Sequence, residues 1–323
     1  MSKLAALKRL GPIQIIFLLL ALIPLTGLPA YQFYILERGM QNGLVVLSLV
    51  ILLGYTGQLS LGQSGLVAVG AYAYGILCVN YGVSPWVSLA IAPLVSGLVG
   101  LLLGIPSFKL TGPFLAVSTI AFSEIVRILI LNNEKFTGGP FGLNRIPTIL
   151  GGLPLYYFML VVAYLASFAT LRLSRSHIGL AFKAIREDEV TAEVMGVHVR
   201  RVKLLAFVIS SILAGLSGVF FANLAGYLNP DSFTFNESST YLLMVVLGGM
   251  GSVTGGILSA FAVTSLPEVL RFMTRYRLIV YALILLLMLR YTKVLNIENL
   301  QRLARRVRRR LFPGTARKDE VQG

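Results

Sequence analysis

The chain has 323 residues, of which 56% are hydrophobic and 13% are charged, and its mean hydropathy is +0.80. Soluble domains are about 45–50% apolar and about 25% charged, so this composition excludes a soluble enzyme, a secreted disulfide scaffold and a disordered chain. The single Cys78 excludes an internal disulfide and a multi-cysteine metal site. Apolar runs of membrane-spanning length recur along the sequence. We therefore expect an all-α, polytopic transmembrane helix bundle.

The net charge of +15 comes mainly from basic residues clustered in three segments, 1–12, 173–203 and 291–323. Lys and Arg accumulate on the cytoplasmic side of membrane proteins. We therefore expect a cytoplasmic N-terminus, a transmembrane domain over residues 13–290 with a cytoplasmic loop at 173–203, and a basic cytoplasmic tail. This distribution gives no reason to expect nucleic acid as a partner, whereas the tail is suited to anionic lipid at the inner membrane surface.

Apolar stretches before the basic loop are each close to the length that spans a bilayer. They are residues 13–28, 43–55, 65–79, 86–105, 114–131 and 155–171. The first stretch has some features of a cleavable signal peptide, but we favour a retained helix. Starting in the cytoplasm, these crossings return the chain there where the basic loop begins.

Three further apolar stretches follow the loop, at residues 204–227, 241–263 and 278–289, and glycines interrupt the middle one. A cytoplasmic C-terminus requires either that the interrupted stretch forms two short helices or that one segment is re-entrant. We therefore expect about 8–10 spans, some of them short or broken, with both termini in the cytoplasm.

Two glycine-rich segments carry the first set of candidate site residues, which are Gly54, Gln58, Ser60, Gln63, Gly248, Gly249 and Gly251. Small residues allow helix backbones to touch in a membrane. Discontinuous helices at membrane depth also expose backbone groups that line a substrate path. These residues are equally consistent with close helix packing and with the lining of a substrate path.

Glu124 and Arg127 lie three residues apart within the stretch 114–131, and therefore on one helix face. Charges inside a span are costly and usually face protein or water, so the pair either fixes helix packing or lines a translocation path. Acid–base catalysis usually needs a second titratable group, and the only other acid apparent near a span is Glu268. We expect no catalytic residue and no metal site.

The basic loop contains a polar segment from Gly179 to Gly196 that we expect to form one amphipathic helix. Ala181, Ala184 and Ile185 would share a face, and Gly196 is placed to end the helix at C′. Such a helix is either a solvated connector or an element that inserts into a groove of a partner protein.

Together these segments resemble the permease subunits of branched-chain amino acid ABC transporters, in the LivM branch. The similar segments are 54–65, 120–127, 137–143, 179–197 and 248–252, in this order, within a region from about Asn42 to Leu289. Phe141 departs from the small or polar residue expected at its position, and the tail beyond Arg290 lacks the usual Arg-Pro-x-Gly-Leu ending.

The resemblance implies a permease subunit of an ATP-driven importer of branched-chain or related hydrophobic amino acids. It also implies that the polar segment of the basic loop couples the chain to a separate ATPase, through Gly179, Ala184, Arg186, Glu187, Asp188, Ala192 and Gly196. The chain has no Gly-x-x-x-x-Gly-Lys-[Ser/Thr] phosphate-binding loop. We therefore expect no enzymatic activity and no cofactor on this chain, with ATP and Mg²⁺ on the partner ATPase.

The implied partners are two ATP-binding subunits, a second homologous permease subunit of the LivH type and a periplasmic or extracellular amino-acid-binding protein, at a bacterial or archaeal cell (inner) membrane. One alternative is an ABC permease for urea, short amides or sugars. Another is a gradient-driven secondary transporter in which Glu124 carries a proton. An intramembrane enzyme is disfavoured, because His177 and His198 are the only histidines and both lie in the basic loop. The cargo stays open, since recognition would lie largely in the binding protein.

Overall fold

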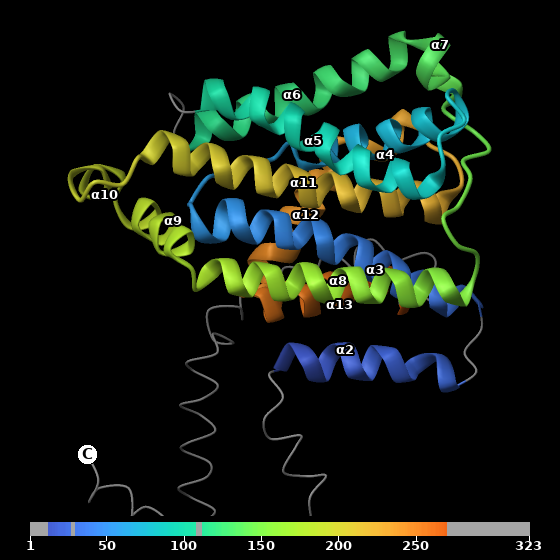
Figure 1. The fold of residues 1–323 in the computed structure, drawn as a ribbon, viewed down its shortest axis with the longest axis horizontal. Coiled ribbons are helices and arrows are strands. Elements are labelled where there is room, and N and C mark those ends of the chain that lie inside the picture. The colour runs from blue at the N-terminus through green and yellow to red at the C-terminus, as the bar shows by residue number, and fades with distance from the viewer. Residues whose placement is uncertain (1–11, 27–29, 108–111, 270–323) are drawn as a thin grey trace, which may run out of the picture. The chain divides into compact units, whose positions relative to one another are not determined.

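The computed structural model describes residues 12–26, 30–107 and 112–269 (Figure 1). The chain divides into two units, Met1–Glu268 and Val269–Gly323. The expected span at 278–289 and the basic tail lie outside the described residues.

In the described ranges the regular elements are helices, apart from an isolated antiparallel bridge between Leu143 and Leu228. The elements of the first half are α2 (Pro12–Leu22), η1 (Ile23–Thr26), α3 (Ala30–Leu49), η2 (Val50–Tyr55), α4 (Gln63–Val79), α5 (Pro85–Ser107), α6 (Pro113–Asn132), α7 (Glu134–Thr137) and η3 (Gly139–Phe141). Those of the second half are α8 (Leu153–Ser174), α9 (His177–Glu187), α10 (Glu189–Val194), α11 (Val199–Ala225), η4 (Pro230–Phe233), α12 (Phe235–Gly248) and α13 (Val253–Val269).

Five segments of the described chain are helical, long and apolar enough to cross a membrane. They are Tyr31–Tyr55, Pro85–Ile105, Pro113–Asn132, Leu153–Ser174 and Val199–Ala225. Two shorter apolar helices, Ile13–Leu22 and Gln63–Val79, accompany them. The described part of the chain therefore has the all-helical character that the sequence predicts.

Helix α11 is the centre of this unit, because it packs against α3, α4 and α5. The contact with α4 is made backbone to backbone: a Cβ on Gly70 would lie 2.3 Å from the Gly215 oxygen, and one on Gly218 would lie 2.1 Å from the Val67 oxygen. Such close approach is the usual use of glycine between membrane helices.

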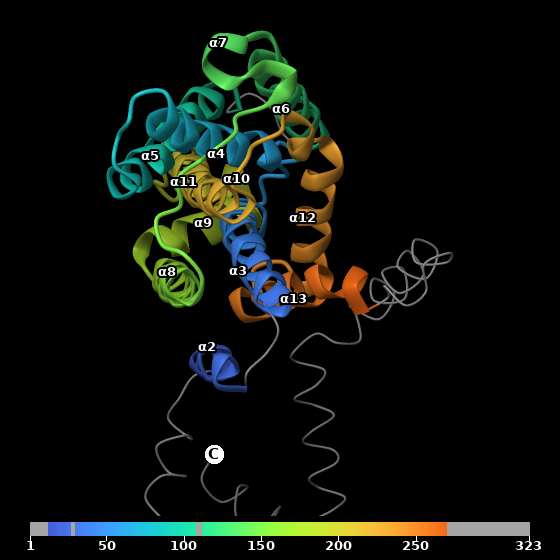
Figure 2. The same cartoon turned by 90° about the vertical axis from the view of Figure 1, so that its right-hand side faces the viewer.

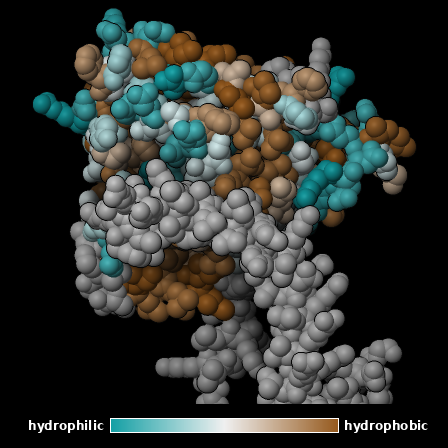
Figure 3. Space-filling model, turned by 180° about the vertical axis from the view of Figure 1, so that it is seen from behind, coloured by the Kyte–Doolittle hydropathy of each residue, from teal (hydrophilic) through white to brown (hydrophobic). Residues whose placement is uncertain are grey.

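The helices lie side by side, with α9 and α10 beyond one end of the bundle and α7 at the opposite end (Figure 1). We call these the α9 end and the α7 end. Viewed from the α7 end, α3 lies between α8 on one side and α12 on the other (Figure 2). Large apolar side chains on α5, α6 and α8 remain exposed, including Leu98, Leu129 and Leu165, and the view from behind shows broad hydrophobic areas (Figure 3). These areas are suited to contact with lipid.

The second span begins well before the predicted start at residue 43, because α3 already starts at Ala30. The prediction was wrong because Glu37 and Arg38 interrupt the apolar pattern there. The structure keeps Arg38 within the helix by placing its guanidinium over the Phe221 ring, 4.8 Å from the centroid. Glu37 is a further acid within a span, in addition to Glu268. Glu37 was not identified from the sequence.

The interrupted stretch at 241–263 forms two short helices, as predicted. Helix α12 ends at Gly248 and α13 begins at Val253. In the turn between them Gly249 has φ +88° and Gly251 has φ +89°, values that side-chain-bearing residues rarely adopt. Gly248 packs on Gly255, where a Cβ on Gly248 would lie 2.6 Å from the Gly255 carbonyl carbon.

Candidate coupling and translocation site

The two glycine-rich segments meet at the α9 end. Gly54 lies in the π-helical turn that ends the second span, and a Cβ on Gly54 would lie 2.6 Å from the Gly251 nitrogen. Real Cβ atoms do not come this close to another backbone. The end of the second span and the turn between α12 and α13 are therefore held in direct backbone contact.

Arg186 ties α9 to this contact. Its Nη1 donates a hydrogen bond to the Gly54 carbonyl oxygen, and the same nitrogen lies 3.6 Å from the position of a Cβ on Gly251. Its Cγ lies 3.4 Å from the position of a Cβ on Gly57. Charge-assisted hydrogen bonds of this kind are stronger than neutral ones. The structure thus brings a residue of the predicted coupling set together with both glycine-rich segments.

Helix α9 is anchored by a buried face made of Gly179, Phe182 and Ile185. Phe182 is completely buried, whereas Ala181 and Ala184, which the sequence analysis placed on the face of Ile185, are half-buried. Gly179 allows α9 to fold back on the end of α8, because a Cβ there would lie 2.1 Å from the Leu173 oxygen. Helix α9 is therefore seated firmly on the bundle.

The predicted single helix from Gly179 to Gly196 is wrong, because the segment contains two helices that break at Asp188. Asp188 has an extended backbone (φ −160°, ψ 117°). Its carboxylate accepts hydrogen bonds from the backbone nitrogens of Val190 at 2.8 Å and Thr191 at 3.0 Å, so it is the N-cap of α10. These backbone donors, that of Thr191 first, lower the pKa of Asp188. Gly196, with φ +86°, follows the C-cap Met195, as the sequence predicts.

Helix α10 is held by one ion pair and exposes an apolar tip. Glu189 pairs with Lys203 of α11 at 2.5 Å, and the Lys203 side chain is only 6% exposed. Ala192 is buried against the protein. On the outer side Val190, Val194 and Met195 are exposed, Val194 to 82%, and Glu187 is exposed beside them. We call these four residues the α10 tip.

The chain between η2 and α4 is not helical, and its polar groups are tied to neighbouring helices. Gln58 Nε2 donates to Thr56 Oγ1 at 2.9 Å and, at 3.4 Å, to the Lys203 carbonyl oxygen of α11. Ser60 is buried, and its Oγ accepts from the Gly62 nitrogen at 3.5 Å. Irregular backbone at membrane depth needs such protein partners.

The start of α4 carries a buried polar network that connects α4 to three other helices. Gln63 Nε2 donates to Ser210 Oγ of α11 at 3.0 Å, and Gln63 Oε1 has no hydrogen-bond partner among the described residues. The Ser64 nitrogen donates to Ser238 Oγ of α12 at 3.0 Å, and Ser64 Oγ lies 3.0 Å from Ser123 Oγ of α6. Sequence reasoning missed Ser123 and Ser238, because isolated serines in apolar spans carry no distinguishing pattern.

Glu124 and Arg127 form a mutual ion pair at 2.6 Å, and Arg127 also pairs with Asp231 of η4 at 3.2 Å. The sequence analysis did not identify Asp231. The cluster lies at the surface of this chain, with side-chain exposures of 50% for Glu124 and 72% for Asp231. Exposed charges on a spanning helix need protein or water beside them. We call these three residues the α6 charge cluster.

In the described residues no group of three or more His, Cys, Asp and Glu side chains is placed to hold a metal ion. The polar groups of this region are mainly hydrogen-bonded serines and glutamines, together with ion pairs.

A family model described as "Branched-chain amino acid transport system / permease component" matches residues 31–289. The chain belongs to this family. It is therefore a membrane permease component, and its predicted resemblance to LivM-type permeases is confirmed.

Three relatives illustrate the range of this permease family. The "high-affinity branched-chain amino acid transport system permease protein LivM" of Escherichia coli (strain K12) is 38% identical over 273 residues, which cover 75% of this chain and 64% of that protein. The match thus spans slightly less than two thirds of the relative. A "probable branched-chain amino acid transport permease protein LivM" of Methanocaldococcus jannaschii is 25% identical, covering 73% and 81%.

The third relative is named for another cargo. The "autoinducer 2 import system permease protein LsrC" of Enterobacter sp. (strain 638) is 29% identical over 213 residues, covering 63% of this permease and 61% of that protein. No solved structure matches the chain.

Proposed function

We propose that this chain is the membrane-spanning permease subunit of an ATP-driven importer for branched-chain or related hydrophobic amino acids. The observation that carries the coupling role is the hydrogen bond from Arg186 to the Gly54 carbonyl oxygen. It links a helix outside the bundle to the point where two interrupted spans touch, so a force applied to α9 reaches both interruptions directly.

The α10 tip is the docking element for the ATPase. Exposed apolar side chains that project beyond a bundle mark a protein-interaction surface more often than solvent contact. The Glu189–Lys203 ion pair and buried Phe182 fix α9 and α10 to the bundle, so that the tip moves with the bundle instead of bending away. The ATPase subunits carry ATP and Mg²⁺, and this chain contributes the helix that they grip.

Closure of the paired ATPases displaces α9, and Arg186 transmits that displacement to Gly54 and Gly251. Interrupted helices have few internal hydrogen bonds at their breaks and act as pivots for rigid-body movement. Tilting of α12 changes the contacts of Ser238 with Ser64 and thereby the path beside the α6 charge cluster. Alternating access follows from this movement.

The remaining partners follow from the family and from the charge distribution. A second, LivH-like permease subunit covers the α6 charge cluster, and an extracytoplasmic binding protein delivers the cargo at the α7 end. Both termini and the α9 end face the cytoplasm of a bacterial or archaeal cell, since basic residues cluster there. The basic tail contacts anionic lipid.

Import of a different small polar cargo is the second candidate, because the LsrC relative is named for autoinducer 2 import. The coupling geometry is compatible with either cargo, so only the substrate assignment differs between the two candidates.

The test is ATP-driven leucine uptake by proteoliposomes that contain the chain with its partner subunits and a leucine-loaded binding protein. We expect Arg186→Ala to reduce uptake and binding-protein-stimulated ATP hydrolysis about tenfold or more, since a charge-assisted hydrogen bond contributes about 1.5–3 kcal/mol. Complex assembly should persist. The matched control is Lys183→Ala, which removes an exposed cation of the same helix.

Full stimulated activity of Arg186→Ala would contradict the coupling role. Uptake of autoinducer 2 instead of leucine would show that the amino acid is the wrong substrate assignment. Uptake without any ATPase, driven by a proton gradient and lost in Glu124→Gln, would identify a secondary transporter instead.

A further inference from the structure

A cavity of about 280 Å³ opens at the α7 end, between the start of α3, the end of α11 and η4. Its lining residues are Tyr34, Arg38, Phe221, Leu224, Ala225, Tyr227 and Ser232. Its volume is close to the lower end of the range of about 300–1,000 Å³ that small-molecule sites occupy. It lies at the opposite end of α11 from the α9 contact and is no part of the coupling site.

Arg38 gives this cavity a fixed positive charge. Its guanidinium stacks on Phe221 at 4.8 Å and donates from Nη1 to Gln41 Oε1 at 3.2 Å. Gln41 is itself held by Ser217 of α11 at 2.8 Å. A guanidinium has five N–H donors, and none of the ion pairs among the described residues involves Arg38. The group is therefore oriented in advance and has donors left for a carboxylate.

Glu237 supplies the opposite charge from α12. It is half-buried and close enough to Arg38 for an electrostatic interaction, but it does not itself line the cavity and among the described residues it makes no ion pair. Two opposite charges that are partly removed from water, yet do not touch, keep most of their desolvation cost. A ligand with both charges would offset that cost at both groups.

Apart from Arg38 and Ser232, the lining side chains are apolar or aromatic. Phe221, Leu224 and Ala225 come from the last turns of α11, and Tyr34 and Tyr227, which are both exposed, also line the cavity. A small-molecule site commonly combines an apolar wall with a few placed polar groups that orient the ligand. Here the wall lies directly beside the cation, as recognition of a short apolar side chain next to a carboxylate requires.

We propose that this cavity binds a free zwitterionic amino acid with an apolar side chain, with its carboxylate on Arg38, its ammonium group toward Glu237 and its side chain against Phe221 and Leu224. The site receives the substrate on the extracytoplasmic side of the membrane. This proposal rests on the proposed function and names a substrate site on the permease itself.

The test uses the assembled transporter in lipid nanodiscs without the binding protein, so that only the membrane complex can bind substrate. Saturation-transfer NMR detects binding of leucine, including weak binding in the millimolar range. We expect signal for leucine, and weaker signal for leucinamide, which lacks the carboxylate, and for 4-methylpentanoate, which lacks the ammonium group.

Arg38→Gln should lower leucine affinity about tenfold or more, because a hydrogen bond to a charged group contributes about 1.5–3 kcal/mol. Arg38→Lys should retain part of the affinity, and Glu237→Gln should abolish the preference for leucine over 4-methylpentanoate. Arg145→Gln is the matched control, since Arg145 is an exposed loop residue. Basal ATP hydrolysis of each purified complex verifies that it is folded.

The proposed site would be overturned if leucine binding were unchanged in both Arg38 variants, or if the wild-type complex bound no leucine. Neither result would affect ATP-driven uptake with the binding protein. Loss of uptake in the wild-type system would instead overturn the proposed function. The two failures are therefore distinguishable.

Discussion

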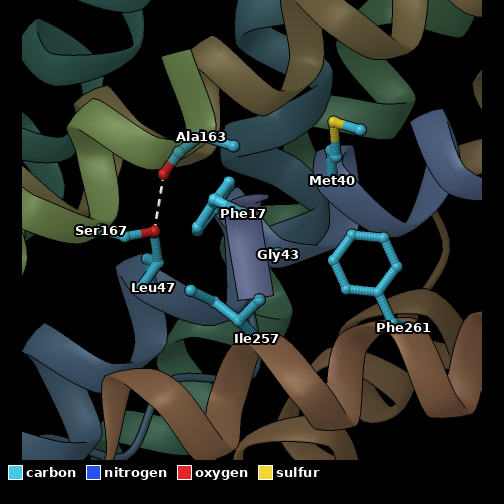
Figure 4. Close-up of a pocket in the computed structure, with 8 residues that line it drawn as sticks. All are labelled: Phe17, Met40, Gly43, Leu47, Ala163, Ser167, Ile257 and Phe261. Carbon is cyan, nitrogen blue, oxygen red and sulfur yellow. Dashed lines mark hydrogen bonds between the residues drawn. The ribbon is translucent and has the colours of Figure 1, made fainter. Parts of the chain in front are cut away.

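Individual glycines of the second span have opposite roles within a few turns. Gly54 touches Gly251 and leaves no space for a side chain, and a Cβ on Gly39 would lie 2.4 Å from the Phe261 ring. Gly43 has no atom within 4 Å of the position of a Cβ. It borders a small apolar pocket between α2, α3, α8 and α13, with Phe17, Met40 and Phe261 around it (Figure 4). Gly54 and Gly39 are needed for close packing against Gly251 and Phe261, whereas the position of Gly43 has space for a side chain.

This contrast predicts opposite effects for the same substitution at two sites. Gly54→Ala should destabilise the protein by about 1–3 kcal/mol, the usual cost of overpacking, and should reduce transport because it separates the two interrupted spans. Gly43→Ala should stabilise it by about 1 kcal/mol through helix propensity. Thermal unfolding in detergent checks both, and a lower melting temperature for Gly43→Ala than for Gly54→Ala would contradict the assignment.

At this scale the sequence identified Gly54, Gly251 and Arg186 as separate candidates. It did not predict that they meet, because their contact joins segments that are distant in the chain and no local pattern encodes it. Ser123, Asp231 and the cavity residue Arg38 were missed for the same reason.

Helices α9 and α10 are separated only by Asp188, which is the C-cap of α9 and the N-cap of α10. In the sequence, Asp188 resembles the other charged residues of the segment. A single helix was therefore predicted there. Only its extended backbone and its hydrogen bonds to Val190 and Thr191 identify it as a boundary. The existence, amphipathic character and glycine end of the segment were predictable from local periodicity, whereas the break was not.

The Asp188 cap should make the α10 tip sensitive to acid. The pKa of Asp188 is lowered in the folded protein, so its contribution is complete above the ordinary Asp pKa of about 3.9 and is lost as the pH falls through the lowered value. A spin label at Val194→Cys should therefore become more mobile below about pH 4.

Asp188→Asn provides the control for this titration, because Asn also caps helices but does not titrate. The acid-induced mobility should be smaller in Asp188→Asn than in the wild type. Identical pH profiles would show that the Asp188 cap does not cause the change.

At the scale of the whole molecule, the α6 charge cluster is the surface where we expect the proposed second permease subunit to bind. Glu124 and Asp231 are half or more exposed on the outside of the described unit, where lipid would leave them poorly solvated. Composition and the apolar runs predicted the all-helical membrane class, whereas the orientation drawn from the basic residues stays a prediction. The position of the charge cluster on α6 could not be predicted, since it depends on which residues of η4 fold against that helix.

Reversing the charge of Arg127 tests this incompleteness. Arg127→Glu places three carboxylates together, and like charges at an interface cost several kcal/mol, so co-purification of the second permease subunit should fall about tenfold or more. Arg127→Lys should assemble normally, and Arg145→Glu serves as the control for a charge reversal at an exposed loop. Equal yields for Arg127→Glu and the control would place the subunit contact elsewhere.

The packing of α4 also constrains how the protein is made. Helix α4 has 17 residues, begins with the buried polar side chains of Gln63 and Ser64, and touches α11 backbone to backbone. Helix α11 follows only after the basic loop, so during synthesis α4 emerges long before the partner that satisfies its polar groups. We therefore expect stable placement of α4 to wait for α11, so that assembly of this permease includes a late docking of helices within the membrane.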